Sequence, residues 1–437
     1  MQNMKSDKLR ICGLVVMIGL FCSAAIIHPQ NIDLTSAERI NHWQEDLNFL
    51  ETNLPQKHIN FYKLMPKERF EHEITDIKNS VPQSSDAEII LRLVRLTASL
   101  GVAHTRIALP TTGSLALHHY PLWFHWFSDG LGVIAASPEY LDALGTRVVR
   151  IGTMTPDELE TNLAPYISYE NKIWLHEESP DYMTVAGLLR HLNIANAGGV
   201  VELTLAKADG KPFTLRVSPV ETNGSDTNRV TTADFLHIPT PLYRKNPNSL
   251  YWYEYLSDAQ TLYIQYRVCE NDPKNPFKNF AKDLFAFADS NSVRRVVVDL
   301  RFNDGGNSEI INPLLEGIRS RPALNVKGRL FILIGPATMS SGEMAAEEFY
   351  NSYSEKAGPH FQATLVGEPT GGKPNCYGDI GVFGLPNSGL QVRYSKKYFR
   401  LTKDGDPPSR EPDITVTRSW EDYLAGRDPV LDAVISH

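Results

Sequence analysis

The sequence is poor in cysteine and in basic charge, and it has no repeats or low-complexity segments. Of its 4 cysteines, only Cys269 and Cys376 lie beyond the N-terminal segment. Two cysteines so far apart do not make a disulfide framework, so we expect two separate buried thiols. The 13 histidines include no H-E-x-x-H or similar spacing, so neither a metal nor another cofactor is predicted. The net charge of −8 disfavours nucleic acid as the main partner.

A long apolar run occurs only at the N-terminus. Residues 11–27 are apolar, follow Lys5, Lys8 and Arg10, and include small residues suited to cleavage. This pattern predicts a secretory signal peptide over residues 1–25, and hence an exported protein, periplasmic or extracellular. The run is only just long enough to span a bilayer, so an uncleaved anchor, the single membrane contact we foresee, is the alternative.

Three regions follow, as expected for a chain of 437 residues. Residues 31–115 predict a helical region, with apolar residues at helical spacing. Residues 118–225 predict a small β module with a helical insertion. Its strand, glycine turn and acidic helix at 144–163 resemble a PDZ domain, which binds peptides by strand addition, although a spacer of similar shape is equally compatible. Residues 230–437 alternate strands and helices, which is typical of a packed α/β domain.

A buried strand, a polar turn and a helix are predicted in succession at residues 330–350. The strand Leu330–Ile334 is apolar without interruption, which is typical of a strand covered on both faces. A serine in the following turn lies beside the free N–H groups and positive dipole end of the helix, which suits a nucleophile. Ser340 and Glu343 also have capping-box spacing, so a purely structural N-cap is the alternative.

Two other strand ends lead into glycine turns. One strand ends at Asp299 and Arg301 and opens at Gly305 and Gly306, where paired glycines let backbone N–H groups approach an oxyanion. A tight turn held by a salt bridge is the alternative there. A later turn holds Lys373, which in an apolar pocket could serve as a base for a serine and on an exposed loop would simply be solvated.

Together these stretches resemble the tail-specific (C-terminal processing) serine protease family, including the related core of the tricorn protease. The D-L-R-x-N-x-G-G stretch of that family matches residues 299–306, and its G-E-P-T-x-G-K stretch matches residues 367–373. Its S-A-S-E-like turn matches the turn at Ser340, and the endings at 411–416 and 425–435 are also similar. The resemblance implies a crotonase-like α/β protease core, so the predicted fold class is mixed α/β.

The resemblance also implies the roles of individual residues. Ser340 would be the nucleophile. The tail-specific enzymes use a lysine as general base, which corresponds to Lys373. The tricorn-like branch uses the histidine of an S-H-T turn, which corresponds to His104 here, after an alanine in place of the serine. An orienting acid would fall near Asp406. The sequence does not decide between Lys373 and His104 as the general base. Oxyanion donors are expected at Gly305, Gly306 and Ser341, and Glu343 is expected to cap the helix and orient the site.

The expected function is a secreted serine endopeptidase that cleaves protein or peptide substrates. The alternative is a non-catalytic secreted protein that uses the same fold to bind a peptide or an apolar ligand. The joint presence of Ser340, Lys373, His104 and the glycine pair favours the enzyme. A crotonase-like acyl-CoA enzyme is a third possibility, which the signal peptide disfavours because CoA substrates are cytosolic.

Overall fold

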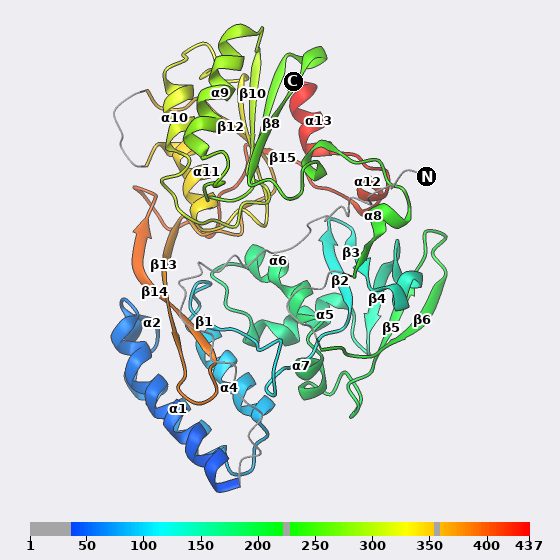
Figure 1. Cartoon of the computed structure of the whole chain (residues 1–437), viewed down its shortest axis with the longest axis vertical. Coiled ribbons are helices and arrows are strands. Elements are labelled where there is room, and N and C mark those ends of the chain that lie inside the picture. The colour runs from blue at the N-terminus through cyan, green and yellow to red at the C-terminus, as the bar shows by residue number, and fades with distance from the viewer. Residues whose placement is uncertain (1–35, 222–227, 354–358) are drawn as a thin grey trace, which may run out of the picture.

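The computed structural model describes residues 36–221, 228–353 and 359–437 (Figure 1). The predicted signal peptide therefore lies outside the described residues. Within these ranges no helix combines the length and apolar character that crossing a bilayer requires. Cys269 and Cys376 are both buried free thiols, as predicted.

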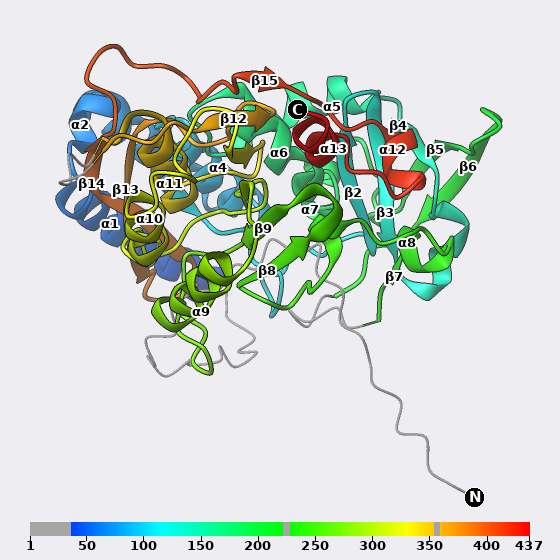
Figure 2. The ribbon, with the colours of Figure 1, turned by 90° about the horizontal axis from the view of Figure 1, so that it is seen from above.

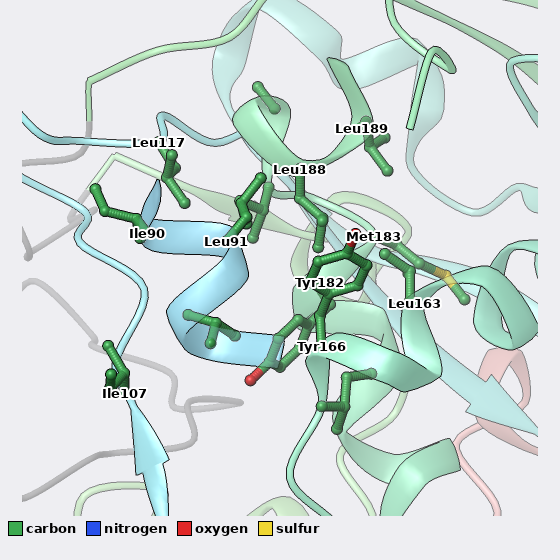
Figure 3. Packing of buried hydrophobic residues seen from close by; sticks show 14 of the residues in the cluster. Ile90, Leu91, Ile107, Leu117, Leu163, Tyr166, Tyr182, Met183, Leu188 and Leu189 are labelled. Atoms are coloured by element: carbon green, nitrogen blue, oxygen red, sulfur yellow. The ribbon is translucent and has the colours of Figure 1, made fainter. Parts of the chain in front are cut away.

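The N-terminal region is helical, as its apolar spacing predicts. A capping box between Ser85 and Glu88 begins its most apolar helix, because each residue bonds the backbone N–H of the other. The buried faces of these helices join one large apolar cluster with the helices of the middle region, and Figure 3 shows Leu91 beside Leu188. The helices are α1 (Ser36–Lys57), α2 (Phe61–Leu64), α3 (Lys67–Ser80) and α4 (Asp86–Ala98).

The middle region combines an antiparallel sheet with several short helices. Its strand order is β2-β3-β4-β5-β6, with β7 paired to β3. The strand predicted within 144–163 is β4, and the acidic helix after it is α5, which begins at a capping box. The strands are β2 (Leu122–Phe127), β3 (Gly130–Ala136), β4 (Arg147–Ile151), β5 (Val201–Ala206), β6 (Pro212–Val217) and β7 (Val230–Thr231). The helices are α5 (Pro156–Leu163), α6 (Lys172–Tyr182), α7 (Ala186–His191) and, after β7, α8 (Thr232–Phe235).

The C-terminal region contains a second six-stranded sheet, ordered β15-β12-β11-β10-β9-β8. All its neighbouring strands are parallel except β8 and β9. The strands are β8 (Tyr251–Leu256), β9 (Thr261–Tyr266), β10 (Arg295–Asp299), β11 (Leu330–Ile334), β12 (Thr364–Gly367) and β15 (Ile414–Thr415). The helices are α9 (Phe277–Ser290), α10 (Asn312–Arg319), α11 (Ser341–Asn351), α12 (Trp420–Leu424) and α13 (Pro429–Ile435).

Helices cover both faces of this sheet, which explains the uninterrupted apolar strand predicted at Leu330–Ile334. Leu330 and Ile332 pack in one cluster with α9, α10 and α11, whereas Phe331 and Leu333 pack in another with α13. Figure 2 shows α13 and the three other helices on opposite sides of the strands. A strand buried on both faces has no need of polar alternation.

A long hairpin leaves the C-terminal region and lies against the N-terminal helices. It consists of β13 (Asn375–Gly384) and β14 (Gln391–Arg400), and β14 also pairs with the short strand β1 (Arg106–Ile107). Figure 1 shows the hairpin in orange descending to α1 and α4. Val392 is fully buried in the core of the helical region. The hairpin thus joins segments that lie almost 300 residues apart in the chain.

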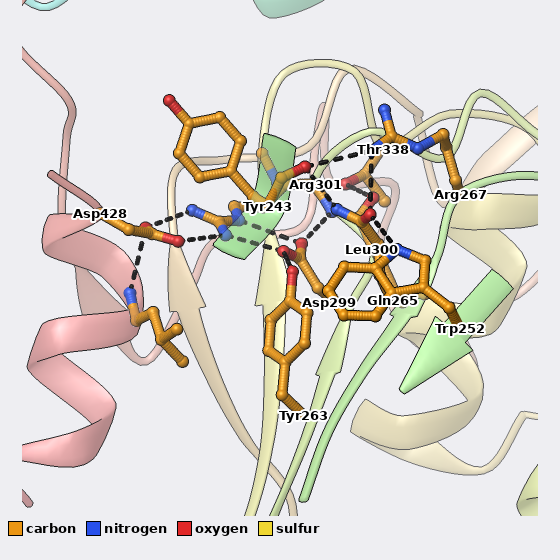
Figure 4. A network of polar contacts seen from close by, with 12 residues as sticks. Tyr243, Trp252, Tyr263, Gln265, Arg267, Asp299, Leu300, Arg301, Thr338 and Asp428 are labelled. Carbon is orange, nitrogen blue, oxygen red and sulfur yellow. Dashed lines mark hydrogen bonds and ion pairs between the residues drawn. The ribbon is translucent and has the colours of Figure 1, made fainter. Parts of the chain in front are cut away.

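A buried ion-pair network fixes the end of β10, where the glycine turn begins (Figure 4). Arg301 donates to Asp299 at 2.7 and 3.0 Å and to Asp428 at 2.7 and 2.8 Å, and Tyr263 donates to Asp299 at 2.6 Å. The salt bridge foreseen at this turn is therefore present. It links β10 to the start of α13 and holds the following loop in place, because every charge in it is paired.

Candidate active site

Ser340 lies at the N-terminus of α11 in a strained backbone conformation. Its φ is 55° and its ψ is −120°, a combination that residues with a side chain rarely adopt. The Ser340 side chain makes no capping hydrogen bond, so the capping-box alternative for Ser340 and Glu343 is wrong. Among the described residues, Ser340 Oγ has no hydrogen-bond partner, so the strain presents a free hydroxyl beside the helix N-terminus.

The glycine turn after β10 packs directly against this serine. A Cβ added to Gly305, whose φ is +117°, would lie 2.7 Å from Ser340 Cβ and 3.0 Å from Ser340 Oγ. Only glycine fits this position, because it tolerates the conformation and leaves the space open. The backbone N–H of Met339 donates to the carbonyl of Asn303 at 3.0 Å, which ties the serine turn to the glycine turn.

Two backbone N–H groups at this junction are available to an oxyanion. The N–H of Gly305, one of the three expected donors, instead donates to Asn303 Oδ1 at 3.0 Å. The N–H groups of Gly306 and Ser341 have no partner within the described chain. The Ser341 hydroxyl donates to the carbonyl of Gly306 at 2.7 Å, which joins the two segments that carry these amides.

His104 is nearly inaccessible to solvent, at 9 % exposure, in the turn that precedes β1. Its neighbour Ala103 belongs to one small apolar cluster with Trp174 and Met339, and Met339 precedes the serine. Burial, together with the positive charges of Arg106 and Arg393, lowers the pKa of His104 to about 4, against the opposing effect of a backbone hydrogen bond with Tyr377. The imidazole is therefore neutral at pH 7, and its buried Nδ1 has no hydrogen-bond partner among the residues that the structure describes.

Lys373 lies in the glycine turn after β12 and is occupied by an ion pair. Its Nζ is 2.7 Å from Asp406 Oδ2, the acid that the sequence suggested. The turn contacts the serine loop, since the N–H of Gly372 donates to the carbonyl of Thr338 at 2.9 Å. The structure thus brings the Lys373 turn and the His104 turn to the same serine loop.

Glu343 is fully buried in α11 beneath the glycine turn of Lys373. A Cβ on Gly372 would lie 2.6 Å from Glu343 Cβ. Burial, followed by repulsion from Glu347, raises the pKa of Glu343 well above its usual range. Glu343 therefore packs against Gly372 in the turn that carries Lys373.

Asn303, the asparagine of the D-L-R-x-N-x-G-G stretch, orders the glycine turn, as described above. Two other neighbours of the site, Asn171 and Glu170, escaped the sequence analysis because their contacts are purely tertiary. Asn171 donates to the carbonyls of Gly371 and Pro408 at 2.9 and 2.7 Å. Burial raises the pKa of Glu170, which precedes Asn171, to about 8, against the opposing effect of Lys373.

The loop that carries Glu170 bridges the three predicted site segments. The hydroxyl of Ser168 donates to the carbonyl of Thr105 at 3.0 Å, beside His104. The bonds of Asn171 reach the Lys373 turn and the Asp406 loop. Within the described chain no cluster of His, Cys, Asp or Glu side chains has a metal-binding arrangement.

Comparison with known proteins defines the fold to which this arrangement belongs. No family model and no curated protein matches the chain. Among solved structures, mature CPAF in complex with lactacystin aligns with 91 % of this chain and 98 % of its own, at a TM-score of 0.62 and 12 % identity. Mature CPAF alone aligns over 91 % and 97 %, at a TM-score of 0.61 and 13 % identity. The chain therefore has the fold of mature CPAF over nearly its whole described length.

More distant alignments include two enzymes whose families the sequence motifs suggest. The photosystem II D1 C-terminal processing protease aligns over 92 % of this chain and 97 % of its own, at a TM-score of 0.40 and 13 % identity. The tricorn protease aligns over 92 % of this chain and 36 % of its own, at a TM-score of 0.44 and 15 % identity. The mixed α/β fold class predicted from the sequence is confirmed by the described sheets and helices and by the likeness to CPAF.

Proposed function

We propose that this chain is a tail-specific-type serine peptidase that hydrolyses peptide bonds of protein or peptide substrates with Ser340 as nucleophile. One observation carries the proposal: a strained serine with a free hydroxyl beside two free backbone N–H groups. Strain of this kind costs about 1–3 kcal/mol and persists where the surrounding structure enforces it, most often at functional sites. The CPAF fold, found over 91 % of the chain, supports the same activity.

The proposed reaction has two steps. Ser340 Oγ attacks the peptide carbonyl while its proton passes to the base. The C–N bond then breaks, the amine leaves with that proton, and an ester remains on the serine. Water attacks the ester with help from the same base, which releases the new carboxyl end and restores the hydroxyl. The N–H groups of Gly306 and Ser341 stabilise the oxyanion, and each such donor is worth about 3 kcal/mol.

We assign the base to His104 in preference to Lys373. A neutral imidazole offers a lone pair at pH 7, and burial keeps His104 neutral. An ammonium group in an ion pair has no lone pair, and Lys373 is paired with Asp406 at 2.7 Å. We therefore give Lys373, Asp406 and Glu343 positioning roles around the serine loop.

Export of the chain, by a cleaved signal peptide or with an uncleaved anchor, remains part of the proposal. So does the PDZ-like function of residues 118–225. Their antiparallel sheet and the acidic helix α5 are compatible with peptide binding by strand addition.

The test is covalent labelling of Ser340 combined with peptide hydrolysis. A serine-reactive fluorophosphonate should label the wild type and Ser290→Ala, a control that removes an exposed hydroxyl bonded only within its helix. Ser340→Ala should lose both labelling and cleavage of casein. A folded wild type that takes up no label at Ser340 and cleaves no peptide would favour the alternative, a non-catalytic binding protein.

A further inference from the structure

The three-stranded sheet β1-β14-β13 has two chemically different faces. Ile107 and Val392, which are register partners, point into the core of the helical region. The residues next to them in each strand, Arg106 and Arg393, are also register partners and must therefore point to the opposite face. The next partner on that face is Val382, which is 53 % exposed. This second face is exposed at Val382, and it carries two guanidinium groups.

The two arginines form an unfavourable pair unless an anion accompanies them. Like charges directly opposite one another across two strands destabilise a sheet. Arg106 has a partner, because its Nη1 lies 3.1 Å from Glu178 Oε2. The half-buried guanidinium of Arg393 makes no hydrogen bond or ion pair with any part of the chain that the structure describes. Burial and repulsion from Arg106 lower the pKa of Arg393, whereas Glu178 opposes the shift.

The charged groups that act on Arg393 are Arg106 and Glu178, whose effects oppose each other, and neither of them is bonded to its guanidinium. His104, the other titratable group beside it, is neutral above a pH of about 4. A guanidinium that is half-buried and unpaired is well suited to bind a carboxylate with two parallel hydrogen bonds.

The backbone connects this guanidinium pair to the proposed reaction centre. His104 lies two residues before Arg106, and its neighbour Ala103 belongs to one small apolar cluster with Met339, the residue before Ser340. Both arginines also act electrostatically on His104. Arg106 also acts on Asp304, the residue before Gly305, and Gly305 packs against Ser340. A peptide bound at Ser340 would therefore have part of its chain within reach of Arg393.

We propose that Arg393 is a specificity-determining residue that binds a carboxylate of the peptide substrate near the scissile bond. This inference rests on the proposed peptidase function and names the substrate class. The exposed side chains of Ile380 and Val382, on the neighbouring strand β13, offer apolar contact to the residues around that carboxylate. The carboxylate comes from a glutamate or aspartate side chain or from the C-terminus of the substrate.

The experiment compares matched peptides that differ in one carboxylate. A quenched fluorescent peptide cleaved by the wild type is resynthesised with Glu or Gln at each position flanking the cleavage site. Each version is made with a free C-terminal carboxylate and with a C-terminal amide. The wild type should prefer one carboxylate-bearing peptide over its neutral counterpart by about tenfold or more in kcat/KM, since a charge-assisted hydrogen bond contributes at least that factor. The position of the preferred carboxylate distinguishes a side chain from the chain terminus.

Variants of Arg393 then assign the preference to this side chain. In Arg393→Gln, the ratio of kcat/KM between the carboxylate-bearing peptide and its neutral counterpart should fall to near one. Arg393→Glu should instead prefer a peptide with Lys at that position. Lys396→Gln is the matched control: it removes an exposed cation from the same strand, and Asp379 keeps its second partner, Lys397. This control should keep the wild-type ratio.

Failure of the inference is distinguishable from failure of the proposed function. A wild type that cleaves Glu and Gln peptides equally at every position, with acid and amide ends alike, refutes the role of Arg393 and leaves the peptidase intact. A preference that survives Arg393→Gln refutes it as well. If the wild type cleaves no peptide, both proposals fall together.

Discussion

The pH at which catalysis fails on the acid side is the sharpest consequence of the site geometry. If His104 accepts the proton of Ser340, activity requires a neutral imidazole. Burial, reinforced by Arg106 and Arg393, lowers the pKa of His104 from 6.5 to about 4. At pH 5.5 a histidine with the ordinary pKa would be neutral in about one molecule in ten, whereas His104 should be neutral in nearly all.

The assay is kcat/KM between pH 4 and pH 9 on a peptide that has no titratable group in this range. The activity at pH 5.5 should be close to that at pH 7.5, with the acid limb centred near pH 4 to 5. His104→Gln should lower kcat/KM by about a hundredfold or more, the usual contribution of a general base. An acid limb centred at pH 6 or above, or a variant with nearly full activity, would refute the assignment of His104.

The same shift gives the free energy of unfolding a pH dependence of known sign. The unfolded chain binds a proton at His104 below pH 6.5, but the folded chain does so only below about pH 4. The contribution of the neutral buried ring is therefore fully present above pH 6.5 and decreases as the pH falls toward 4, by roughly 3 kcal/mol in total. His104→Gln should lack this component. In urea unfolding, the free energy of unfolding should therefore decrease more between pH 7 and pH 4.5 in the wild type than in the variant. Equal decreases in the two proteins would mean that His104 titrates normally in the folded chain.

Four residues give the remaining predictions. Gly305→Ala places a methyl group 2.7 Å from Ser340 Cβ, and should lower kcat/KM about a hundredfold or more while the circular-dichroism spectrum stays that of a folded chain; near-normal activity would contradict the close approach. Lys373→Met should lower kcat/KM by no more than about tenfold, because the lysine positions the site; a loss of a thousandfold or more would make it the base. Glu170→Gln should raise the free energy of unfolding over that of the wild type, and in urea unfolding this increase should be larger at pH 8 than at pH 5 by about 2 kcal/mol or more. The reason is that Glu170 stays protonated up to about pH 8 in the folded chain, which destabilises the wild type increasingly from pH 4.5 upward. An equal effect of the substitution at both pH values would mean that this acid is solvated. Asp428→Asn should lower the free energy of unfolding by about 3 kcal/mol, since it removes one partner of the buried Arg301; a loss below 1 kcal/mol would mean that water enters the network.

The sequence was sufficient for the features that local chemistry decides. An uninterrupted apolar segment can only be buried on both faces, so the strand Leu330–Ile334 was predictable with its neighbours. The paired glycines at Gly305 and Gly306 marked a close backbone approach, and a salt bridge at this turn was the alternative that the sequence offered. The second partner of Arg301, Asp428, became known only from the structure. The ordered motifs also predicted the fold class that CPAF shares.

The capping box at Ser340 shows where local spacing misled. Ser85 and Glu88 have the same spacing and do form a capping box, because the start of α4 is free to adopt extended backbone. Ser340 has a positive φ where the glycine turn packs against it, and its side chain makes no hydrogen bond to the helix amides. Sequence spacing is the same in both cases, and only the packed neighbour decides between them.

The amino-acid sequence alone therefore determines the strand ends, the turns and the reactive side chain types in residues 230–437, since these follow from apolar runs and glycine positions. The tertiary structure decides which of them act together. It buries His104 so that the imidazole is neutral, and it pairs Lys373 with Asp406 across 33 residues. It also sets Arg393 opposite Arg106, across nearly 300 residues. Protonation states and pairings depend on solvent exclusion and on the distance between charges, and neither quantity exists until the chain has folded.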